Sequence, residues 1–274
     1  MRKYCIIVAG GSGRRMKSAL PKQFLLLEGR PLLMHTIERF STFDSSIVII
    51  VVLPSEHHQL WRRLCKEHAF EVSHRIVAGG EERFHSVKAG LDEVAQDLAG
   101  RRNRSDGAAG EGAMHDSTVG EGAGYDSAAG KGSKADGAAA GGSKADDLLI
   151  AIHDGVRPLV SHDTIWRCFA DAEEFGNAVP FIEPADSVRV ILGDDSRPWQ
   201  RNEIRLIQTP QVFRGSVIMK AYRRNFNPAF TDDATVAEAD GMKIHLTHGN
   251  RENLKITTPE DLAVAATLYG MISR

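Results

Sequence analysis

The chain has 274 residues, 42% of them hydrophobic, a size that suits one large α/β domain or two small ones. Its 36 acidic and 34 basic residues give a net charge of −2, which argues against a general nucleic-acid-binding protein. The three cysteines, Cys5, Cys65 and Cys168, are too scattered for a zinc site or a disulfide framework and are typical of a reducing cytoplasm. The sequence has no apolar run long enough to cross a bilayer and no secretory signal, so we expect no membrane association.

Apolar runs and helical patterns alternate in the first part of the chain. Runs rich in β-branched and other apolar residues predict buried strands over residues 4–8, 47–53 and 75–78. Large apolar residues at helical spacing predict one helix after each strand, and these helices contain Leu33 and Ile37, Trp61 and Leu64, and Val87 and Leu91. This alternation predicts parallel strands joined by right-handed crossovers.

Residues 101–147 interrupt this order. They consist mostly of Gly, Ala, Ser, Asp and Lys and repeat crudely at a period of about ten residues. Such a segment cannot bury enough apolar surface to offset the entropy lost on ordering, so we predict a flexible insertion between a helix and a strand. A calcium-binding repeat is the alternative, but its glycine-rich nonapeptide pattern is absent.

The pattern of strands and helices resumes after the insertion. We predict strands over 148–152 and 178–182, a helix over 163–175, a helix starting within 231–235, and a last short strand over 253–257. Thr258 and Pro259 have the residue types of an N-cap and a first helical position. Residues 186–206 are polar, with alternating Val188, Val190 and Leu192, and predict a short hairpin arm.

A glycine-rich sequence, Ala-Gly-Gly-Ser-Gly-Arg-Arg-Met, follows the first strand at residues 9–16, and Pro-Lys-Gln stands at residues 21–23. The spacing matches neither the P-loop nor the dinucleotide fingerprint, so the glycines alone fit a plain strand-exit turn equally well. Glycines also let backbone N–H groups approach a ligand. With Arg15 and Lys22 added as fixed cations, the pattern favours a triphosphate site at a strand end, while Arg14 is better explained as a surface arginine.

Five further motifs join this loop to a family pattern. They are Phe after Pro-Lys-Gln, His-Asp-Gly-Val-Arg-Pro at 153–158, Thr-Pro-Gln at 209–211, Thr-Asp-Asp-Ala at 231–234 and Asn-Leu-Lys-Ile-Thr at 253–257. Together they resemble the cytidylyltransferases that activate sugar or polyol phosphates, and most closely the 2-C-methyl-D-erythritol 4-phosphate cytidylyltransferase family. The resemblance covers nearly the whole chain outside 101–147, where the family has a short loop.

The resemblance implies a single cytidylyltransferase domain over 1–274 with a Rossmann-like, glycosyltransferase-A-like α/β fold. Its mostly parallel sheet is flanked by helices, and an arm over 186–206 serves dimerisation. The implied reaction transfers a cytidylyl group from CTP to 2-C-methyl-D-erythritol 4-phosphate, with Mg²⁺, in the non-mevalonate isoprenoid pathway. A cytoplasmic homodimer without nucleic-acid or membrane partners is expected.

The resemblance also assigns roles to individual residues of this chain. The implied catalytic residues are Arg15, Lys22, Arg201 and Lys255, and the implied metal ligand is Asp154. The implied contacts to the nucleotide are Ala9, Gly10, Gly11, Gly13, Gly80, Glu81, Arg83, Ser86 and Gly155. The implied contacts to the acceptor are Asp186, Ser187, Arg157, Thr209 and Thr231.

Several alternatives stay open at this point. Ribitol 5-phosphate cytidylyltransferases share the loop, the lysine and the aspartate, and Arg205 rivals Arg201 as the holder of the acceptor phosphate. A nucleotide-binding regulatory module without catalysis is a third alternative, but it would not need the acceptor-side residues. His153 next to Asp154 is interpreted as structural, because a phosphate acceptor is already ionised near neutral pH and needs no general base.

Overall fold

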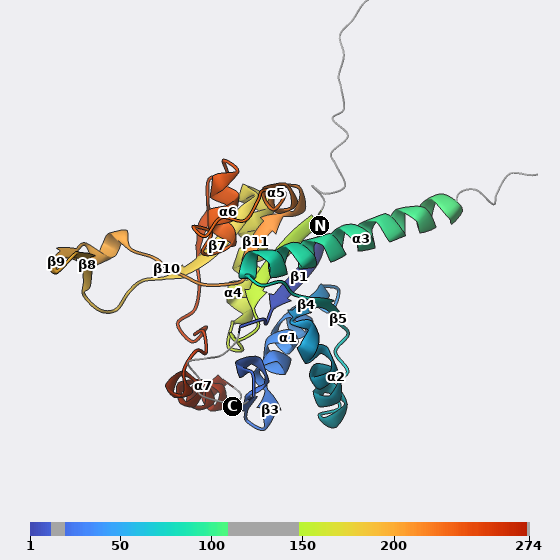
Figure 1. Ribbon diagram of the computed structural model, residues 1–274, viewed down its shortest axis with the longest axis horizontal. Coiled ribbons are helices and arrows are strands. Elements are labelled where there is room, and N and C mark those ends of the chain that lie inside the picture. Colours follow the sequence, from blue (N-terminus) through green and yellow to red (C-terminus); the bar gives the residue numbers. More distant parts are fainter. Residues whose placement is uncertain (12–19, 109–147, 273–274) are drawn as a thin grey trace, which may run out of the picture.

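The computed structural model describes residues 1–11, 20–108 and 148–272 of the chain. Within these residues, eight strands form a central sheet of order β10-β7-β11-β6-β1-β4-β5, with β12 also paired to β7 (Figure 1). The bounds are β1 Arg2–Val8, β4 Val48–Leu53, β5 Arg75–Ala78, β6 Leu148–Asp154, β7 Asn177–Ile182, β10 Leu206–Ile207, β11 Gln211–Arg214 and β12 Leu246–His248. The sheet contains every strand predicted from an apolar run before residue 183.

The middle of the sheet is parallel, as the alternation of strands and helices predicts. Strand β1 pairs in parallel with both β4 and β6, and β5 pairs in parallel with β4. The sheet becomes mixed at β11, which lies antiparallel between β6 and β7 and was not predicted. The register of β1 and β6 sets Val8 opposite Asp154, so the loops that follow these two strands leave the same edge together.

Helices cover both faces of the sheet and make three layers. Helices α1 (Leu32–Phe43), α2 (His58–Glu67) and α4 (His162–Phe175) pack on one face, and α3 (Arg83–Ala108), α5 (Gly215–Ala221) and α6 (Asp233–Ala239) on the other. Successive side chains of a strand point to opposite faces, so Cys5 and Ile7 of β1 join the first core while Tyr4 and Ile6 join the second. Burial on both faces explains why β1 is apolar throughout most of its length.

Helix α7 (Pro259–Ile272) closes a third, smaller core over Leu27, Leu32 and Val156. Its start agrees with the predicted cap, since the Thr258 hydroxyl accepts a hydrogen bond from the backbone N–H of Asp261. The strand predicted over 253–257 is wrong: the segment forms no ladder, and the N–H of Ile256 donates to the carbonyl of Val156. This bond, together with the bonds of Asn253 to Arg157 and Thr209, holds the segment without making it part of the sheet.

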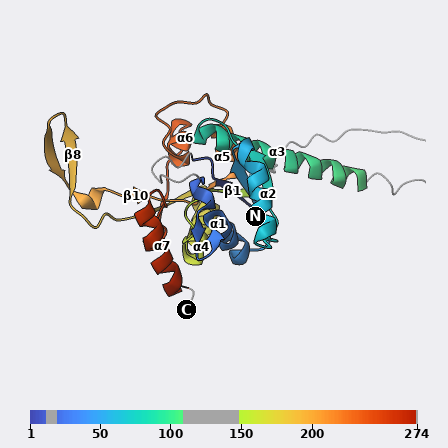
Figure 2. The same cartoon turned by 60° about the horizontal axis from the view of Figure 1, so that its bottom comes forward.

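A hairpin of β8 (Val188–Leu192) and β9 (Asp195–Trp199) projects from the body as its own two-stranded sheet (Figures 1 and 2). It confirms the hairpin predicted from the alternating apolar residues. A second small hairpin, β2 (Leu26–Leu27) with β3 (Arg30–Pro31), lies between the short 3₁₀ helix Lys22–Phe24 and α1. Two further 3₁₀ turns in the described ranges are Ser55–His57, which leads into α2, and Arg201–Glu203, at the root of the arm.

Helix α3 runs on to Ala108, so the first part of the segment 101–147 continues the helix (Figure 2). Residues 109–147, which hold the rest of the predicted insertion, lie outside the described residues. None of the helices in the described ranges is both long and apolar enough to span a bilayer.

Candidate active site

A cleft of about 290 Å³ opens at the carboxyl ends of β1 and β6. It is lined by Val8, Ala9, Gly10, Gly11, Lys22, Gln23, Gly80, Glu81, Glu82, Arg83, Ser86, Asp154, Val156 and Lys255. Ligands of open α/β sheets bind at this edge, outside the carboxyl ends of the strands. The structure therefore gathers into one cleft most of the residues that the sequence predicts for the nucleotide and for catalysis.

Gly155 allows the two strand exits to touch. Its N–H donates to the carbonyl of Val8 at 2.8 Å, and a Cβ placed on it would lie 2.8 Å from the Cβ of Ala9. A larger residue would force the exits apart. Gly155 is buried and is not among the residues that line the cleft, and the Thr36 hydroxyl donates to its carbonyl at 3.1 Å.

The described start of the glycine loop lies against two other site residues. Gly10 lies beside Ser86, and a Cβ on Gly11 would be 2.9 Å from Cε of Lys22. Lys22 belongs to the 3₁₀ helix Lys22–Phe24, whose buried Phe24 ring stacks on Trp61 and anchors the turn. Lys22 is thus brought next to the loop as predicted, whereas Gly13 and Arg15 lie outside the described residues.

Asp154 ends β6 at the floor of the cleft, and three cations surround its carboxylate. Oδ2 lies 3.0 Å from Nζ of Lys255 and 3.1 Å from Nε of Arg157, while Oδ1 lies 3.7 Å from Nε of Arg83. Burial would raise the pKa of this carboxyl, but the charges of Lys255, Arg83 and Arg157 outweigh it and hold the pKa far below its ordinary value. Asp154 is therefore an anion over the whole physiological range.

A buried chain of hydrogen bonds holds the backbone of Asp154 in place. The Thr209 hydroxyl accepts from the backbone N–H of Asp154 at 3.1 Å and lies 3.0 Å from Nδ1 of His153, whose Nε2 is 3.2 Å from the carbonyl of Arg157. Because that carbonyl can only accept, Nε2 carries the proton and Thr209 donates to Nδ1. Burial lowers the pKa of His153 to about 4, so the ring is neutral and both nitrogens are occupied, in line with its predicted structural role. Thr209, expected at the acceptor, is 5% exposed and lies behind Asp154.

The segment that contains Lys255 is tied to the same strand exits. The Asn253 side chain donates to the carbonyl of Thr209 at 2.8 Å, and the Asn253 carbonyl accepts from Nη1 of Arg157 at 2.7 Å. Arg157 therefore bridges Asp154 and this segment. These bonds orient Lys255 toward the cleft, although its side chain stays 41% exposed.

The loop after β5 forms the opposite wall of the cleft. Ser86 lies on the first turn of α3, where its hydroxyl is 3.4 Å from the carbonyl of Gly80. Arg83 starts α3 and makes a bidentate ion pair with Asp233, with N–O distances of 2.7 and 2.6 Å. Gly80, Glu81, Arg83 and Ser86 thus line the cleft as a group, although Arg83 also points toward α6.

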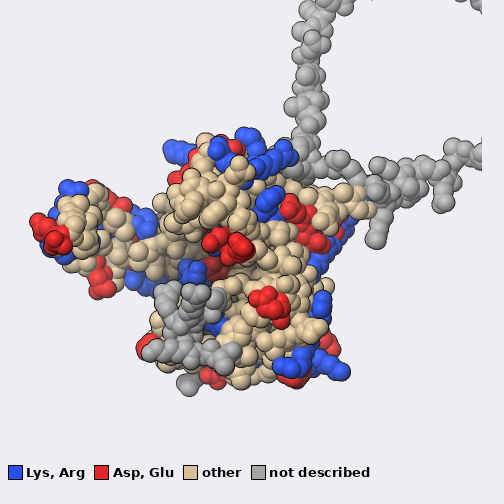
Figure 3. Space-filling view, viewed as in Figure 1, with Lys and Arg blue, Asp and Glu red and all other residues tan. Residues whose placement is uncertain are grey.

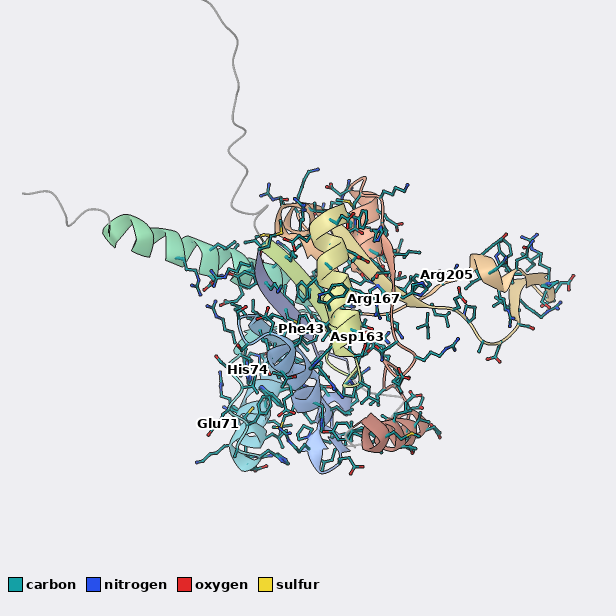
Figure 4. The ribbon with its side chains drawn as sticks, turned by 180° about the vertical axis from the view of Figure 1, so that it is seen from behind. Phe43, Glu71, His74, Asp163, Arg167 and Arg205 are labelled. Carbon is teal, nitrogen blue, oxygen red and sulfur yellow. The ribbon has the colours of Figure 1, made fainter. Side chains whose placement is uncertain are left out.

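Apart from Arg157 and Thr209, which contact Asp154, the acceptor-side residues of the prediction lie elsewhere. Asp186, Ser187 and Arg201 are exposed at the arm, and Nη1 of Arg201 donates to the carbonyl of Ala185. Thr231 lines a separate hollow beside α6. Arg205 lies at the root of the arm, where it pairs with Glu183 and covers the ring of Phe181 (Figure 4). The free end of the arm is crowded with charges of both signs (Figure 3). In the described part of one chain, none of these residues lines the cleft.

A divalent cation fits this cleft only together with phosphate ligands. The described residues include no group of three or more His, Cys, Asp or Glu side chains that could hold a metal. Asp154 supplies one ionised carboxylate beside the glycine loop, and Mg²⁺ commonly binds through one or two carboxylates plus waters and substrate phosphates. The donor set therefore suits a cation that arrives with a nucleotide.

Two residues of the site were missed from the sequence. Asp233 belongs to the motif at a predicted helix start and was given no role, yet it is fully buried and pairs with Arg83. Gln23 lines the cleft, fully buried, with no hydrogen-bond partner among the described residues for either amide atom. Asp233 belongs to the motif Thr-Asp-Asp-Ala and Gln23 to Pro-Lys-Gln, but a short motif does not show which of its side chains points into the protein.

The chain matches the sequence profile described as "IspD: 2-C-methyl-D-erythritol 4-phosphate cytidylyltransferase" over residues 4–101 and 131–270. The chain belongs to this family. A protein of Bacteroides fragilis with that name is 41% identical over 268 residues, covering 98% of this chain and all of that protein. A Bacteroides thetaiotaomicron protein of the same name is 40% identical over the same share of both chains. The family is one of nucleotidyltransferases, so this chain is identified as an enzyme of that class.

Solved structures of the family share the fold. The 2-C-methyl-D-erythritol 4-phosphate cytidylyltransferase from Thermus thermophilus superposes with a TM-score of 0.65 at 23% identity, covering 98% of both chains. A structure of 4-diphosphocytidyl-2C-methyl-D-erythritol synthase reaches a TM-score of 0.67 at 19% identity, covering 98% of this chain and all of that one. The expected α/β fold, with a mostly parallel sheet between helices, is thereby confirmed.

Proposed function

We propose that this enzyme transfers the cytidylyl group of CTP to 2-C-methyl-D-erythritol 4-phosphate and releases pyrophosphate. An oxygen of the acceptor phosphate attacks the α-phosphorus in line, and the bond to the β-phosphate oxygen breaks. The observation that supports this most is the convergence of Lys22, Lys255 and Asp154 on one cleft at the ends of β1 and β6. Family membership supports the choice of CTP and of the acceptor.

Fixed charges supply the catalysis in this proposal. Negative charge grows on the α-phosphate and on the departing pyrophosphate during transfer, and preorganised cations stabilise it more than the ground state. Lys22 lies beside Gly11, so its ammonium and the backbone N–H groups of the loop would face the triphosphate together. Lys255 would face the α-phosphate from its place beside Asp154. Gly80, Glu81 and Ser86 would contact the base and ribose.

We assign the divalent cation, Mg²⁺, to Asp154. When bound, the cation neutralises triphosphate charge and helps pyrophosphate to leave. Asp154 is suited to hold it because its carboxylate stays ionised, and Thr209 keeps the backbone of Asp154 in place. Lys255 and Arg157 at Oδ2 and Arg83 near Oδ1 balance the charge of Asp154 in the protein alone.

We further propose a cytoplasmic homodimer that completes the acceptor site. An isolated two-stranded hairpin is marginal in water, and the arm exposes Ile191 at 70% and Leu192 at 54%, so it needs a surface to pack on. Arg201 lies at the root of this arm, away from the cleft of its own chain, and would act in the site of the partner. The cytoplasmic location rests on cysteine usage, since Cys5, Cys65 and Cys168 are all free.

Pyrophosphate release tests the reaction directly. The purified chain is incubated with Mg²⁺, one nucleoside triphosphate and one acceptor phosphate, and pyrophosphate is measured with time. We expect turnover with CTP and methylerythritol phosphate, and far less with ATP, with UTP or with ribitol 5-phosphate. A higher kcat/KM for ribitol 5-phosphate would transfer the assignment to that acceptor, and CTP binding without release would favour the regulatory module.

A further inference from the structure

Arg83, in the wall of the cleft, is held by the carboxylate of Asp233 at the start of α6. Its Nη1 and Nη2 donate to the two oxygens of Asp233 at 2.7 and 2.6 Å, although the residues are 150 positions apart in the chain. Asp233 is fully buried, so its carboxylate is shielded from water. A bidentate pair of this kind fixes the plane of the guanidinium as well as its position.

Asp233 itself has little freedom. The Tyr222 hydroxyl donates to its Oδ1 at 2.6 Å, and the Tyr222 ring stacks on Phe84, the residue after Arg83. The next residue, Ala234, donates its backbone N–H to the side chain of Gln211 in strand β11. The carboxylate that clamps Arg83 is therefore anchored to both the end of α5 and the central sheet.

The third nitrogen of the guanidinium faces the proposed metal ligand. Nε of Arg83 lies 3.7 Å from Oδ1 of Asp154, whereas Lys255 and Arg157 occupy the side of Oδ2. Arg83 thus spans two carboxylates, one fully buried and one at the floor of the cleft. A rigid cation on one side of Asp154 restricts the rotation of its carboxyl group.

We infer that Arg83, clamped by Asp233 and Tyr222, is a positioning residue that sets the orientation of the Asp154 carboxylate. This inference rests on the proposed function, in which Asp154 holds the divalent cation, and it differs from the contact to the nucleotide that the family resemblance implies for Arg83. Asp233 and Tyr222 act on catalysis through Arg83 and do not touch the substrates. Because Arg83 follows loop 79–82 directly, the clamp also fixes that loop relative to Asp154.

Two measurements on Tyr222→Phe and Asp233→Asn test the clamp. The first is steady-state kinetics, in which we expect kcat to fall on the order of tenfold in each variant, with a smaller change in KM for CTP. The second is the Mn²⁺ affinity of the complex with a non-hydrolysable α,β-methylene analogue of CTP, followed by water-proton relaxation. We expect this affinity to weaken on the order of tenfold.

A double-mutant cycle separates the clamp from independent effects. In an Arg83→Met background, Asp233→Asn and Tyr222→Phe should cause little further loss of kcat, because both act through Arg83. The matched control is Arg75→Met, which breaks ion pairs to Glu93 and Asp97 far from the cleft. That control should lower the melting temperature and leave kcat and Mn²⁺ affinity unchanged.

Asp233→Asn alone can fail to fold, since it leaves a charged arginine against a buried amide. The double variant Arg83→Met/Asp233→Leu removes both charges and keeps the test valid. A folded double variant, or a folded Tyr222→Phe, with wild-type kcat and wild-type Mn²⁺ affinity would overturn the inference. A rise in KM for CTP at unchanged kcat would overturn it too and restore Arg83 as a contact to the nucleotide. Since Mn²⁺ affinity is measured without turnover, it tests the clamp even if the proposed reaction fails.

Discussion

The ammonium nitrogen of Lys255 lies 3.0 Å from Oδ2 of Asp154, and this ion pair joins the last motif of the chain to the end of β6. Asp154 is buried, while the side chain of Lys255 is 41% exposed. The lysine therefore sits between the floor of the cleft and solvent, where an incoming phosphate can reach it. The contact joins two site residues that were predicted separately and lie far apart in the sequence.

Lys22→Ala should lower kcat on the order of a hundredfold or more, because it removes a fixed cation beside the glycine loop. The structure predicts little effect on folding, since Lys22 is partly exposed. Pyrophosphate release and thermal unfolding check the two parts. The control is Lys66→Ala, an exposed lysine on α2, which should behave as wild type. Near wild-type turnover in folded Lys22→Ala would remove the proposed role.

Thr209→Val should destabilise the protein and slow catalysis. It deprives the N–H of Asp154 and Nδ1 of His153 of their partner, at a cost of about 2 kcal/mol or more in the free energy of unfolding. Loss of the anchor behind Asp154 should also lower kcat by roughly tenfold. Denaturant unfolding and steady-state rates measure both effects. Thr209→Ser keeps the hydroxyl and should be close to wild type; equal losses in the two variants would point to the methyl group instead.

His153 should make the protein less stable as the pH falls from about 6.5 to about 4. Its pKa is lowered to about 4 in the folded chain, from an ordinary value near 6.5, so in this window the unfolded chain binds a proton that the native chain does not. The free energy of unfolding should fall by up to about 3 kcal/mol across it. His153→Gln should show a correspondingly flatter pH dependence. Parallel curves for the two proteins would contradict the assignment.

Replacing residues 109–147 by a short Gly-Ser linker should leave activity and melting temperature little changed. The composition of this segment gives it few apolar groups to pack. The match to the family profile also leaves out residues 102–130, most of which belong to this segment. The replacement keeps Arg101, whose Nε pairs with Asp97 at 2.9 Å on α3. Thermal unfolding and pyrophosphate release are the measurements. A large drop in either would show that the segment packs against the body.

Subunit mixing tests the proposed dimer. If Arg201 acts in the partner's site while Lys22 acts in its own, Lys22→Ala and Arg201→Ala homodimers should each be nearly inactive. In a heterodimer of the two, one site has both defects and the other has neither, because a two-fold interface exchanges the arms reciprocally. Random reassembly of an equal mixture should therefore restore about a quarter of wild-type activity per chain.

The mixed sample needs proof of exchange, for example from differently tagged chains that co-purify. Exchange without returning activity would mean that Arg201 acts in its own chain or that the arm is not swapped. A monomer in solution would reject the dimer outright. Arg205→Ala, mixed in the same way, distinguishes the two arginines that the sequence left as rivals for the acceptor phosphate.

The sequence by itself determined the long elements and the places of most site residues. Strands β1, β4 and β6 are buried on both faces, so their apolar runs stand out, and the motifs follow directly where β1 and β6 end. Parallel neighbours bring their carboxyl ends to one edge, which is why Lys22, Asp154 and the loop 79–82 could be expected near one another.

Only the tertiary structure decided the contacts between distant segments. Strand β11 has four residues and β12 three, too few to show a period, and their pairing depends on the neighbours β6 and β7. The segment 253–257 looks like a strand because it carries apolar residues, yet hydrogen bonds to Arg157 and Val156 hold it instead of a ladder. Packing between elements also decides that Asp233 points toward Arg83 and that Thr209 points toward Asp154. A local sequence pattern fixes backbone conformation, but it does not fix the long-range partner of a polar side chain.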